Sequence, residues 1–469
     1  MLYRKYVHRL EDFLRNQPNK ILLVNGARQI GKSYIIRHVG KKLFKNYVEI
    51  NLKEDKEGDA LFAKVRSLQD FHMQLSALAG KHLDKKENTL VFLDEIQSYP
   101  ALLTMLKFLN QEGKYTYIAS GSQLGVALSQ TPSVPLGSIA IDEMYPLDFE
   151  EFLLAMNCGE NVIEAARKCF EKHEPLSEAL HDYMLRQLKT YLIIGGLPET
   201  INRFIETQNI VQCRKVQQDI MNLYRIDASQ YDEEHKLLIR RIYDMIPSNL
   251  ENKKKRVVIK NIEEGKGHRS FADYANEFEY LTASGVALEV KAISNPRFPL
   301  IETGTKNLLK LYLNDVGILT QQLYGNNINA ILHDERSINL GTVYESVVAQ
   351  ELHAHGFPLF YYDNKKTGEV DFLIDDFRNL TALPLEIKSG KDYKIHSALD
   401  KFLATKEYNI NRAIVFSNER NVTEVNGFVY MPIYYCMFLY RDVQDAEAQT
   451  LPILPPPEVL IDRMPVKRD

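Results

Sequence analysis

The chain has 469 residues, 45% of them hydrophobic and 26% charged, and its formal net charge is −4. This balance excludes a global electrostatic attraction to nucleic acid or anionic membranes, so either kind of binding would need a local basic patch. The length exceeds that of one ordinary hydrophobic core, and we expect several domains. The four cysteines are widely spaced without a CxxC pair, which argues against disulfides or a zinc site and favours reduced cytosolic thiols.

The ends of the chain are not apolar enough to suggest membrane targeting. Residues 1–19 are charged and amphipathic, which predicts one helix and not a signal peptide. The most apolar stretch, residues 429–440, is too short to cross a bilayer and contains Pro432. We therefore expect a cytoplasmic protein without a membrane segment.

Short apolar runs alternate with helical patterns up to about residue 150. The runs that we expect to form strands are Ile21–Val24, Tyr47–Leu52, Leu90–Leu93 and Tyr115–Ala119. Alternation of this kind predicts a parallel sheet with crossover helices. We therefore predict an α/β domain over residues 1–155.

A glycine-rich segment follows the first predicted strand. It fits the phosphate-loop pattern GxxxxGK[ST] in full and reads Gly26-Ala27-Arg28-Gln29-Ile30-Gly31-Lys32-Ser33. Its glycines let backbone N–H groups face phosphate oxygens, while Lys32 is expected to reach the β- and γ-phosphates and Ser33 to bind Mg²⁺. The helical run that begins at Tyr34 completes the expected context, and Tyr34 is included in the site. The alternative is a glycine-rich turn before a helix.

A second motif supports the first. The apolar run Leu90–Leu93 ends in Asp94 and Glu95, as expected of a Walker B strand. Asp94 would hold Mg²⁺ and Glu95 would polarise the attacking water. We predict ATP and Mg²⁺ as ligands, although no guanine-reading motif or adenine signature separates ATP from GTP. Ser120, after the strand Tyr115–Ala119, is a candidate γ-phosphate sensor or an ordinary loop residue.

The middle of the chain is predicted to contain two units. Helical patterns predict a lid over residues 156–237, and residues 238–330 suggest a winged-helix-like domain. In the second unit we expect a helix within Phe271–Ser284, a strand pair in Val286–Ile293 and a strand at Leu309–Leu313. The stretch before them is basic and either contacts a DNA backbone or forms a solvated face; its cations are Lys253, Lys254, Lys255, Arg256, Lys260, Lys266, His268 and Arg269.

A second α/β unit is predicted over residues 335–445, followed by an extended tail over residues 446–469. Glu345 lies in an expected helix, and Asp371 ends a Gly-Glu-Val-Asp turn. Glu386 and Lys388 alternate along an expected strand and so share a face. Carboxylates that hold Mg²⁺ and a lysine that orients water are what a metal-dependent phosphodiesterase needs. The same residue types also occur at strand ends in proteins that cleave nothing.

From these motifs the chain resembles the bacterial and archaeal AAA-type ATPases that carry a C-terminal domain of unknown function. The resemblance covers most of the chain, and beyond the phosphate loop it is carried by Phe92–Gln97, Ser120–Ser122, Tyr145–Phe152, Gly195–Glu199, Leu313–Gly317 and Gly368–Phe372. It implies a P-loop NTPase core with a helical lid. The order Glu, Asp, Glu-x-Lys also resembles the restriction-endonuclease-like fold, which implies a possible nuclease site at Glu345, Asp371, Glu386 and Lys388.

One departure from this family concerns hydrolysis. Many relatives have an arginine where this chain has Ser138, and an arginine near the γ-phosphate stabilises transition-state charge. Arg28 or Arg225 could replace it, or a partner subunit could complete the site. Three functions therefore remain: an ATPase that controls a C-terminal effector domain, an ATP-regulated DNA nuclease, or a non-catalytic nucleotide switch. DNA, a protein partner and a second copy of the chain are candidate partners.

Overall fold

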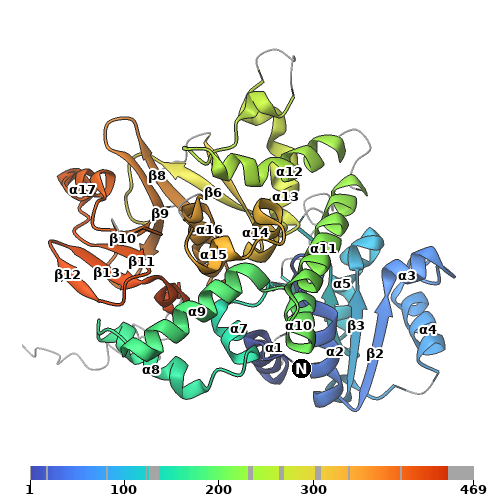
Figure 1. Ribbon diagram of the computed structural model, residues 1–469. Helices are drawn as coiled ribbons and strands as arrows, with labels where there is room; N and C mark the ends of the chain where they lie inside the picture. The colour runs from blue at the N-terminus through green and yellow to red at the C-terminus, as the bar shows by residue number, and fades with distance from the viewer. Residues whose placement is uncertain are drawn as a thin grey trace, which may run out of the picture.

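The computed structural model describes residues 2–16, 19–80, 83–122, 124–125, 137–230, 236–263, 269–300, 308–335, 338–390 and 393–441. Two sheets lie side by side with helices around and between them, and the N-terminal helix lies near the contact between the two halves (Figure 1). The tail expected over residues 446–469 lies outside the described residues. No helix in the described ranges is long and apolar enough to cross a membrane.

The N-terminal sheet has five parallel strands in the order β2-β3-β4-β1-β5. The strands are β1 (Ile21–Asn25), β2 (Asn46–Asn51), β3 (Thr89–Asp94), β4 (Thr116–Ser120) and β5 (Ile139–Glu143). The predicted parallel sheet is therefore confirmed. The edge strand β5 was not predicted, because only Ile139 is buried, the other four residues are partly or fully exposed, and the strand gives no continuous apolar run.

Helices cover both faces of this sheet. They are α1 (Lys5–Asn16), α2 (Lys32–Leu43), α3 (Leu52–Glu57), α4 (Leu68–Ala79), α5 (Pro100–Glu112) and α7 (Phe149–Ala155). One core packs Phe71 and Leu106 of α4 and α5 against Leu23 of β1. The opposite side chains of the same strand, Leu22 and Val24, belong to a larger core with α1 and α2, as alternation along a strand requires.

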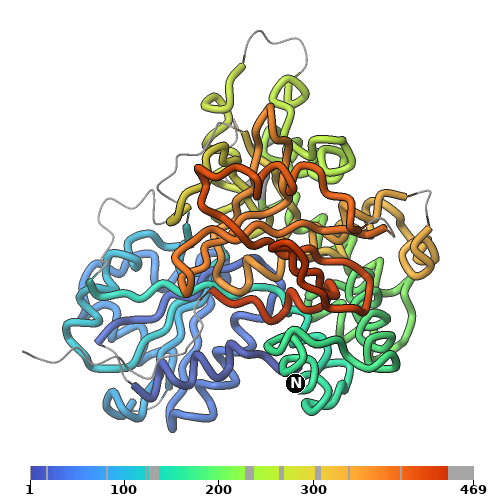
Figure 2. The backbone as a smooth tube through the Cα atoms, turned by 90° about the vertical axis from the view of Figure 1, so that its left-hand side faces the viewer, coloured from blue at the N-terminus to red at the C-terminus, as the bar shows by residue number. Residues whose placement is uncertain are grey.

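The predicted lid region is helical. It contains α8 (Glu160–Glu171), α9 (Glu178–Ile194), α10 (Pro198–Thr207) and α11 (Ile210–Gln230), and α12 (Lys236–Glu251) follows. Figure 2, turned by 90° from Figure 1, shows the blue-green segments of α8 and α9 beside the blue sheet and below the orange and red strands, whereas the yellow-green segment of α12 lies at the top. The lid therefore lies against both halves of the molecule.

The C-terminal sheet has eight strands in the order β12-β13-β11-β10-β9-β8-β6-β7. They are β6 (Ala287–Ile293), β7 (Leu309–Leu313), β8 (Phe360–Asn364), β9 (Gly368–Asp376), β10 (Thr381–Ile387), β11 (Ala413–Ser417), β12 (Thr423–Val425) and β13 (Phe428–Pro432). The segment expected to be a strand pair is the single strand β6. Because β6 pairs in parallel with β8, the strands assigned to a separate winged-helix unit extend the C-terminal sheet.

Five further helices belong to this half. They are α13 (Ala275–Ala283), α14 (Val316–Tyr324), α15 (Asn329–Leu332), α16 (Leu340–Ala354) and α17 (Ser397–Leu403). Short 3₁₀ turns occupy Lys86–Asn88, Ile96–Ser98, Ile259–Asn261, Phe271–Tyr274, Lys406–Tyr408 and Ile433–Phe438. Helix α17 packs Leu399 and Phe402 in a core of its own on one side of the sheet.

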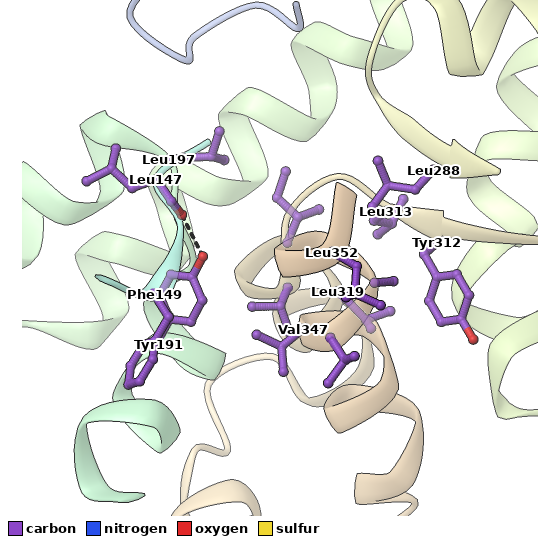
Figure 3. Packing of buried hydrophobic residues seen from close by; sticks show 14 of the residues in the cluster. Leu147, Phe149, Tyr191, Leu197, Leu288, Tyr312, Leu313, Leu319, Val347 and Leu352 are labelled. Carbon is purple, nitrogen blue, oxygen red and sulfur yellow. Dashed lines mark hydrogen bonds between the residues drawn. The ribbon is translucent and has the colours of Figure 1, made fainter. Parts of the chain in front are cut away.

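The large core continues from the N-terminal half into the C-terminal half. Figure 3 shows Phe149 and Tyr191 on one side, Leu288 and Leu313 on the other, and Val347 of α16 between them. All five side chains are buried. A buried apolar interface of this kind makes independent motion of the two halves costly.

Candidate nucleotide site and its junction with the C-terminal half

The phosphate loop follows β1 and relies on glycine at both ends. Gly26 has φ 143°, and a Cβ atom there would lie 2.3 Å from the backbone oxygen of Met144. Gly31 has φ 94° and is the N-cap of α2, so no side chain caps the helix and the N–H groups of its first turn remain available to an anion. The loop residues Ala27 and Ile30 are buried and anchor it to the large core.

Gly26→Ala is expected to lower the free energy of unfolding by about 3 kcal/mol, because the added methyl clashes with Met144 and the backbone conformation disfavours alanine. Thermal unfolding and ATP titration measure the effect, and ATP affinity should fall with stability. Gly137→Ala is the matched control, since a Cβ atom there meets no atom within 4 Å. Equal stability of the two variants would contradict this view of the loop.

The charged and hydroxyl groups of the two motifs meet at the ends of β1, β3 and β4. Lys32 is buried, and its Nζ donates to the backbone oxygens of Gly26 at 2.8 Å and Ala27 at 2.7 Å. Burial lowers its pKa to about 8, although Glu95 and Asp94 oppose the shift. The Ser33 hydroxyl donates to Asp94 Oδ2 at 2.7 Å.

Asp94 is also bound from β4. The Ser120 hydroxyl donates to Asp94 Oδ1, which places it as expected of a strand between the two motif strands. A buried carboxylate flanked by the hydroxyls of Ser33 and Ser120 offers the hard oxygen ligands that Mg²⁺ prefers, so these residues fit the ion. Bound there, Mg²⁺ would neutralise charge on the phosphates.

Glu95 is held in place by Gln97, a residue to which the sequence analysis assigned no role. Its φ is 54°, an unfavourable backbone conformation for glutamate that turns the residue out of β3. Gln97 Nε2 donates to Glu95 Oε2 at 2.5 Å. Gln97 also lies so close to Gly121 that a Cβ atom there would be 2.1 Å from Gln97 Oε1. Gln97 therefore positions Glu95 against the loop after β4.

Arg28 is anchored by the lid. Its Nε lies 2.8 Å from Asp227 Oδ2 of α11 and donates to the Ser122 hydroxyl at 3.2 Å. Tyr224, also on α11, donates to the backbone oxygen of Arg28 at 3.0 Å. Arg28 and Asp227 both influence the pKa of Lys32, so they lie near the phosphate site. Arg225 instead pairs with Asp244 Oδ1 at 2.6 Å on α12.

Ser138 lies at the opposite end of the sheet from the phosphate loop. Its backbone oxygen accepts a hydrogen bond from Ile21 N at 2.9 Å, and the loop begins only after Asn25. A strand of this length spans about 17 Å. The serine therefore removes no guanidinium from the nucleotide site of its own chain, so an effect of this departure on hydrolysis does not arise within one chain.

Tyr34 lines a cavity beside the loop. The cavity has a volume of about 530 Å³, and Tyr34 is 55% exposed. Its other walls come from the N-terminal segment, the phosphate loop and the lid, and are Leu2, Arg4, Gln29, Ile30, Gly31, Ile35, Pro198, Glu199, Asn202, Arg203 and Glu206. An aromatic ring in a cavity that adjoins a phosphate loop suits a flat nucleobase.

Three segments that carry the family resemblance but have no assigned chemistry meet at one junction: Tyr145–Phe152, Gly195–Glu199 and Leu313–Gly317. Gly196 N donates to Asp315 Oδ2 at 2.6 Å, and Gly196 O accepts from Leu147 N at 2.7 Å. A Cβ atom on Gly196 would lie 2.1 Å from Leu147 O, so glycine is required there. Asp315 Oδ1 also accepts from Ile318 N at 3.0 Å at the start of α14. The lid, the N-terminal sheet and the C-terminal half are therefore joined by direct hydrogen bonds.

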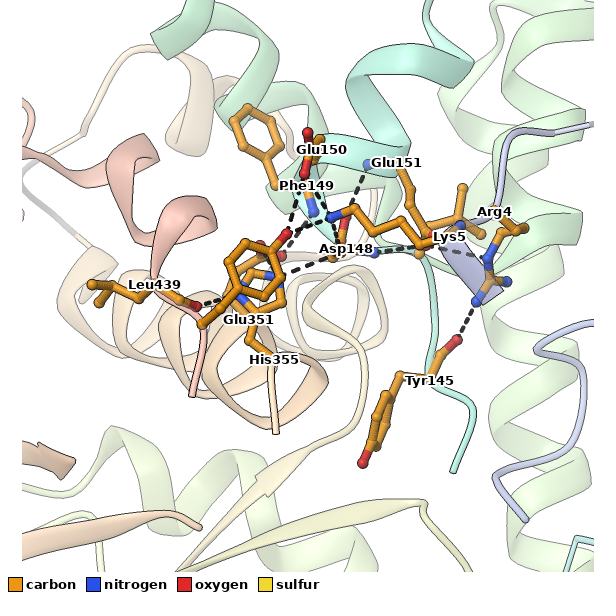
Figure 4. A network of polar contacts seen from close by, with 12 residues as sticks. Arg4, Lys5, Tyr145, Asp148, Phe149, Glu150, Glu151, Glu351, His355 and Leu439 are labelled. Atoms are coloured by element: carbon orange, nitrogen blue, oxygen red, sulfur yellow. Dashed lines mark hydrogen bonds and ion pairs between the residues drawn. The ribbon is translucent and has the colours of Figure 1, made fainter. Parts of the chain in front are cut away.

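The N-terminal helix adds a second link (Figure 4). Arg4 is buried and donates to the backbone oxygens of Ile30 at 2.9 Å and Tyr145 at 2.6 Å, and its Nε lies 3.2 Å from Glu151. Arg4 therefore ties the phosphate loop to the segment that follows β5. No sequence motif indicates Arg4, because it lies well before the loop and its role depends on tertiary contacts.

Lys5 extends this link to the C-terminal half. Its Nζ lies 2.6 Å from Asp148 Oδ2 and donates to the Tyr440 hydroxyl at 2.7 Å. His355, directly after α16, lies 3.4 Å from the same aspartate oxygen, and Glu351 of α16 accepts from Phe149 N at 2.8 Å. The charged network in Figure 4 thus connects α1, α7 and α16.

The four residues of the possible nuclease site are brought into one cluster, but lysines hold its acids. Lys255 contacts Glu345 Oε1, and Lys388 lies 2.8 Å from Glu386 Oε1. Asp371 Oδ2 accepts from Ile387 N at 2.8 Å. Asp371 lies inside β9, because the hairpin turn comes before Gly368 and not at the Gly-Glu-Val-Asp segment.

The basic stretch predicted to face DNA is partly internal. Lys255 ends in this acid cluster, and Arg256 lies 2.7 Å from Asp363 and 3.1 Å from Glu369. The surface assignment is therefore wrong for these two cations, while Lys253 and Lys254 are exposed. Within the described ranges, no three His, Cys, Asp or Glu side chains are grouped so that they could hold a metal ion.

Comparison with known families defines the class of the N-terminal half. Residues 18–153 match the family described as an AAA domain, and residues 185–328 and 340–436 match two domains of unknown function, DUF8612 and DUF4143. The chain therefore contains an AAA-type, nucleotide-binding ATPase domain. An uncharacterized protein of Methanocaldococcus jannaschii is 23% identical over 420 residues, which cover 87% of this chain and 84% of that protein.

Solved structures give a weaker likeness. The Walker-type ATPase of Pyrococcus abyssi is 15% identical over 68% of this chain and 95% of its own, with a TM-score of 0.41. The Orc1 protein of Aeropyrum pernix, solved in complex with DNA, is 14% identical over 69% of this chain and 94% of its own, with a TM-score of 0.30. These scores are too low to transfer any property.

Proposed function

We propose that this protein is a Mg²⁺-dependent ATPase whose nucleotide state is transmitted to the C-terminal half. The arrangement of Lys32, Ser33, Asp94, Glu95 and Ser120 at the ends of three neighbouring strands carries the proposal. Lys32 and the loop bind the phosphates, Ser33 and Asp94 hold the metal, and Glu95 orients the attacking water.

Arg28 is the guanidinium that we assign to the γ-phosphate. It lies in the loop, and its pairing with Asp227 and Ser122 keeps it close to Lys32. The lid helix α11 supplies Asp227, so any movement of the lid repositions Arg28. This arrangement favours an ATPase over the non-catalytic switch, because it supplies a guanidinium although Ser138 stands where many relatives have an arginine.

Two sets of contacts support transmission to the C-terminal half. The phosphate loop is bound by Arg4, whose neighbour Lys5 reaches Asp148 and Tyr440. The loop is also approached by Gly285, where a Cβ atom would lie 3.0 Å from Ala27 N. A shift of the loop on nucleotide binding would therefore be felt beyond the N-terminal domain.

Metal-dependent DNA cleavage is the less favoured alternative. A helix followed by three antiparallel strands, a further helix and a parallel strand supports a restriction-endonuclease-like fold for residues 340–436. The acids of the cluster, however, are paired with lysines and backbone groups. The residues present therefore do not fit a divalent cation in this conformation.

Lys32→Ala is expected to reduce ATP turnover by about 100-fold or more, because it removes a preorganised cation from the phosphate site. Phosphate release with ATP and Mg²⁺ measures this, and addition of double-stranded DNA tests whether DNA stimulates turnover. Lys41→Ala, an exposed change on the same helix α2, should leave turnover unchanged. Turnover that survives in the Lys32 variant would refute the ATPase proposal.

A further inference from the structure

Lys255 enters the C-terminal acid cluster from the turn that follows α12. Its φ is 51°, a backbone conformation that lysine rarely adopts, and its backbone N–H donates to Asn252 O at 3.0 Å. The ammonium contacts Glu345 Oε1 of α16, and only 16% of the lysine side chain is exposed. The other oxygen of Glu345 accepts from the Tyr312 hydroxyl at 3.2 Å. Both oxygens of this carboxylate therefore have partners.

The remaining acids of the cluster come from neighbouring strands. Burial, together with the charges of Glu345 and Glu386, raises the pKa of Asp371 well above its ordinary value. Lys255 opposes that rise, so its charge acts on Asp371 as well as on Glu345. Glu386 is 7% exposed, and its Oε2 is buried and accepts no hydrogen bond from the described residues. The cluster therefore contains a buried carboxylate oxygen that no hydrogen bond from the described residues satisfies.

An ammonium and a divalent cation demand different surroundings. Carboxylate oxygens stand about 2.8 Å from a lysine nitrogen, whereas Mg²⁺ needs them at about 2.1 Å. The lysine also brings a positive charge that repels a second cation at close range. Consistent with this, the described residues contain no metal-binding group of three acids, histidines or cysteines.

We propose that the Lys255 ammonium takes the place of a divalent cation among Glu345, Asp371 and Glu386, and that this closes the cluster to metal. The acid cluster then also holds the turn after α12 against the C-terminal half, through the ion pair between Lys255 and Glu345. Lys388 remains paired with Glu386 and cannot substitute for Lys255. This inference does not depend on the proposed ATPase activity.

Binding of Mn²⁺ to the nucleotide-free full-length chain, followed by the electron paramagnetic resonance of free Mn²⁺, tests the proposal. Wild type and Asp371→Asn should bind the same amount, because no Asp371-dependent site is open. Lys255→Met should bind an additional equivalent, which the double variant Lys255→Met/Asp371→Asn should lose. The exposed neighbouring change Lys254→Met is the control and should match wild type.

Lys255→Arg separates the role of the charge from that of the methylene stem, because it keeps a cation in the acid cluster. This variant should therefore bind no additional Mn²⁺. Circular dichroism shows which variants are folded. If Asp371→Asn binds less Mn²⁺ than wild type, the wild-type cluster is already open to metal. This result alone would overturn the proposal. Folded Lys255→Met that binds no more Mn²⁺ than wild type would also overturn it, because something other than Lys255 would then close the cluster.

Discussion

Glu95→Gln is expected to reduce ATP turnover by about 1,000-fold while leaving ATP affinity within about threefold of wild type. The glutamine keeps the size of the side chain and can still pair with Gln97, but it cannot accept a proton from water or polarise it as a carboxylate does. Glu95 turns out of β3, and the hydrogen bonds of Ser33 and Ser120 to Asp94 do not involve its carboxylate. Loss of turnover without loss of binding is therefore the expected signature.

Single-turnover phosphate release and equilibrium titration with ATP measure the two quantities separately. Glu87→Gln, an exposed change just before β3, should leave both unchanged. If ATP affinity falls in proportion to turnover in Glu95→Gln, the carboxylate binds the nucleotide complex and does not act in the chemical step.

Arg4→Met is expected to lower the free energy of unfolding by about 3 kcal/mol near pH 8 and to weaken ATP binding. Methionine keeps most of the apolar volume but leaves Glu151 without its cation and the backbone oxygens of Ile30 and Tyr145 without donors. Since Ile30 belongs to the phosphate loop, instability and weak nucleotide binding should appear together.

The pH dependence of Arg4→Met follows from Glu151. Burial raises the pKa of Glu151 above its ordinary value, and Arg4 opposes that rise. A carboxyl with a raised pKa stabilises the fold at low pH, and this contribution is lost as pH rises through the folded-state pKa. Without Arg4 the folded-state pKa is higher still, so the variant should lose more stability than wild type between acid and neutral pH.

Urea unfolding at a series of pH values measures this difference. Arg15→Met, in the helix α1 that directly follows Arg4, is the control, because the Arg15 side chain is 61% exposed and its pair with Glu11 should contribute less than about 0.5 kcal/mol. A deficit in Arg4→Met that does not change with pH would show that the lost hydrogen bonds, and not the charge of Glu151, account for it.

The strands and the loop of the N-terminal domain could be predicted from the sequence because their signals are local. The strands β1, β3 and β4 are buried on both faces and read as continuous apolar runs, and the loop after β1 matches its pattern residue by residue. The same rule explains why β5 was missed, since only the first residue of this edge strand is buried and the others are partly or fully exposed. The single strand β6 was read as a pair because alternation does not reveal where a strand ends.

The sequence by itself determined the residue types that the proposed site offers to phosphate and metal, because a loop between a strand and a helix brings Gly26, Lys32 and Ser33 together without contacts from distant parts of the chain. Only the tertiary structure decided which partners those groups have. Arg4, Gln97 and Asp227 reach the site from an N-terminal helix, a short turn and the lid, and no spacing rule relates them to the loop.

The basic stretch also shows that the sequence alone does not reveal which side chains form tertiary contacts. A run of lysines is usually solvated. Lys255 and Arg256 nevertheless turn inward, because they form ion pairs with acids on α16 and on the strands β8 and β9. Ser138 was considered for the nucleotide site because many relatives have an arginine at this position. It directly precedes β5, at the end of the sheet opposite to the phosphate loop, and therefore lies away from the site of its own chain. Charge and motif are properties of the chain, but the distance between two groups is set by how strands and helices pack.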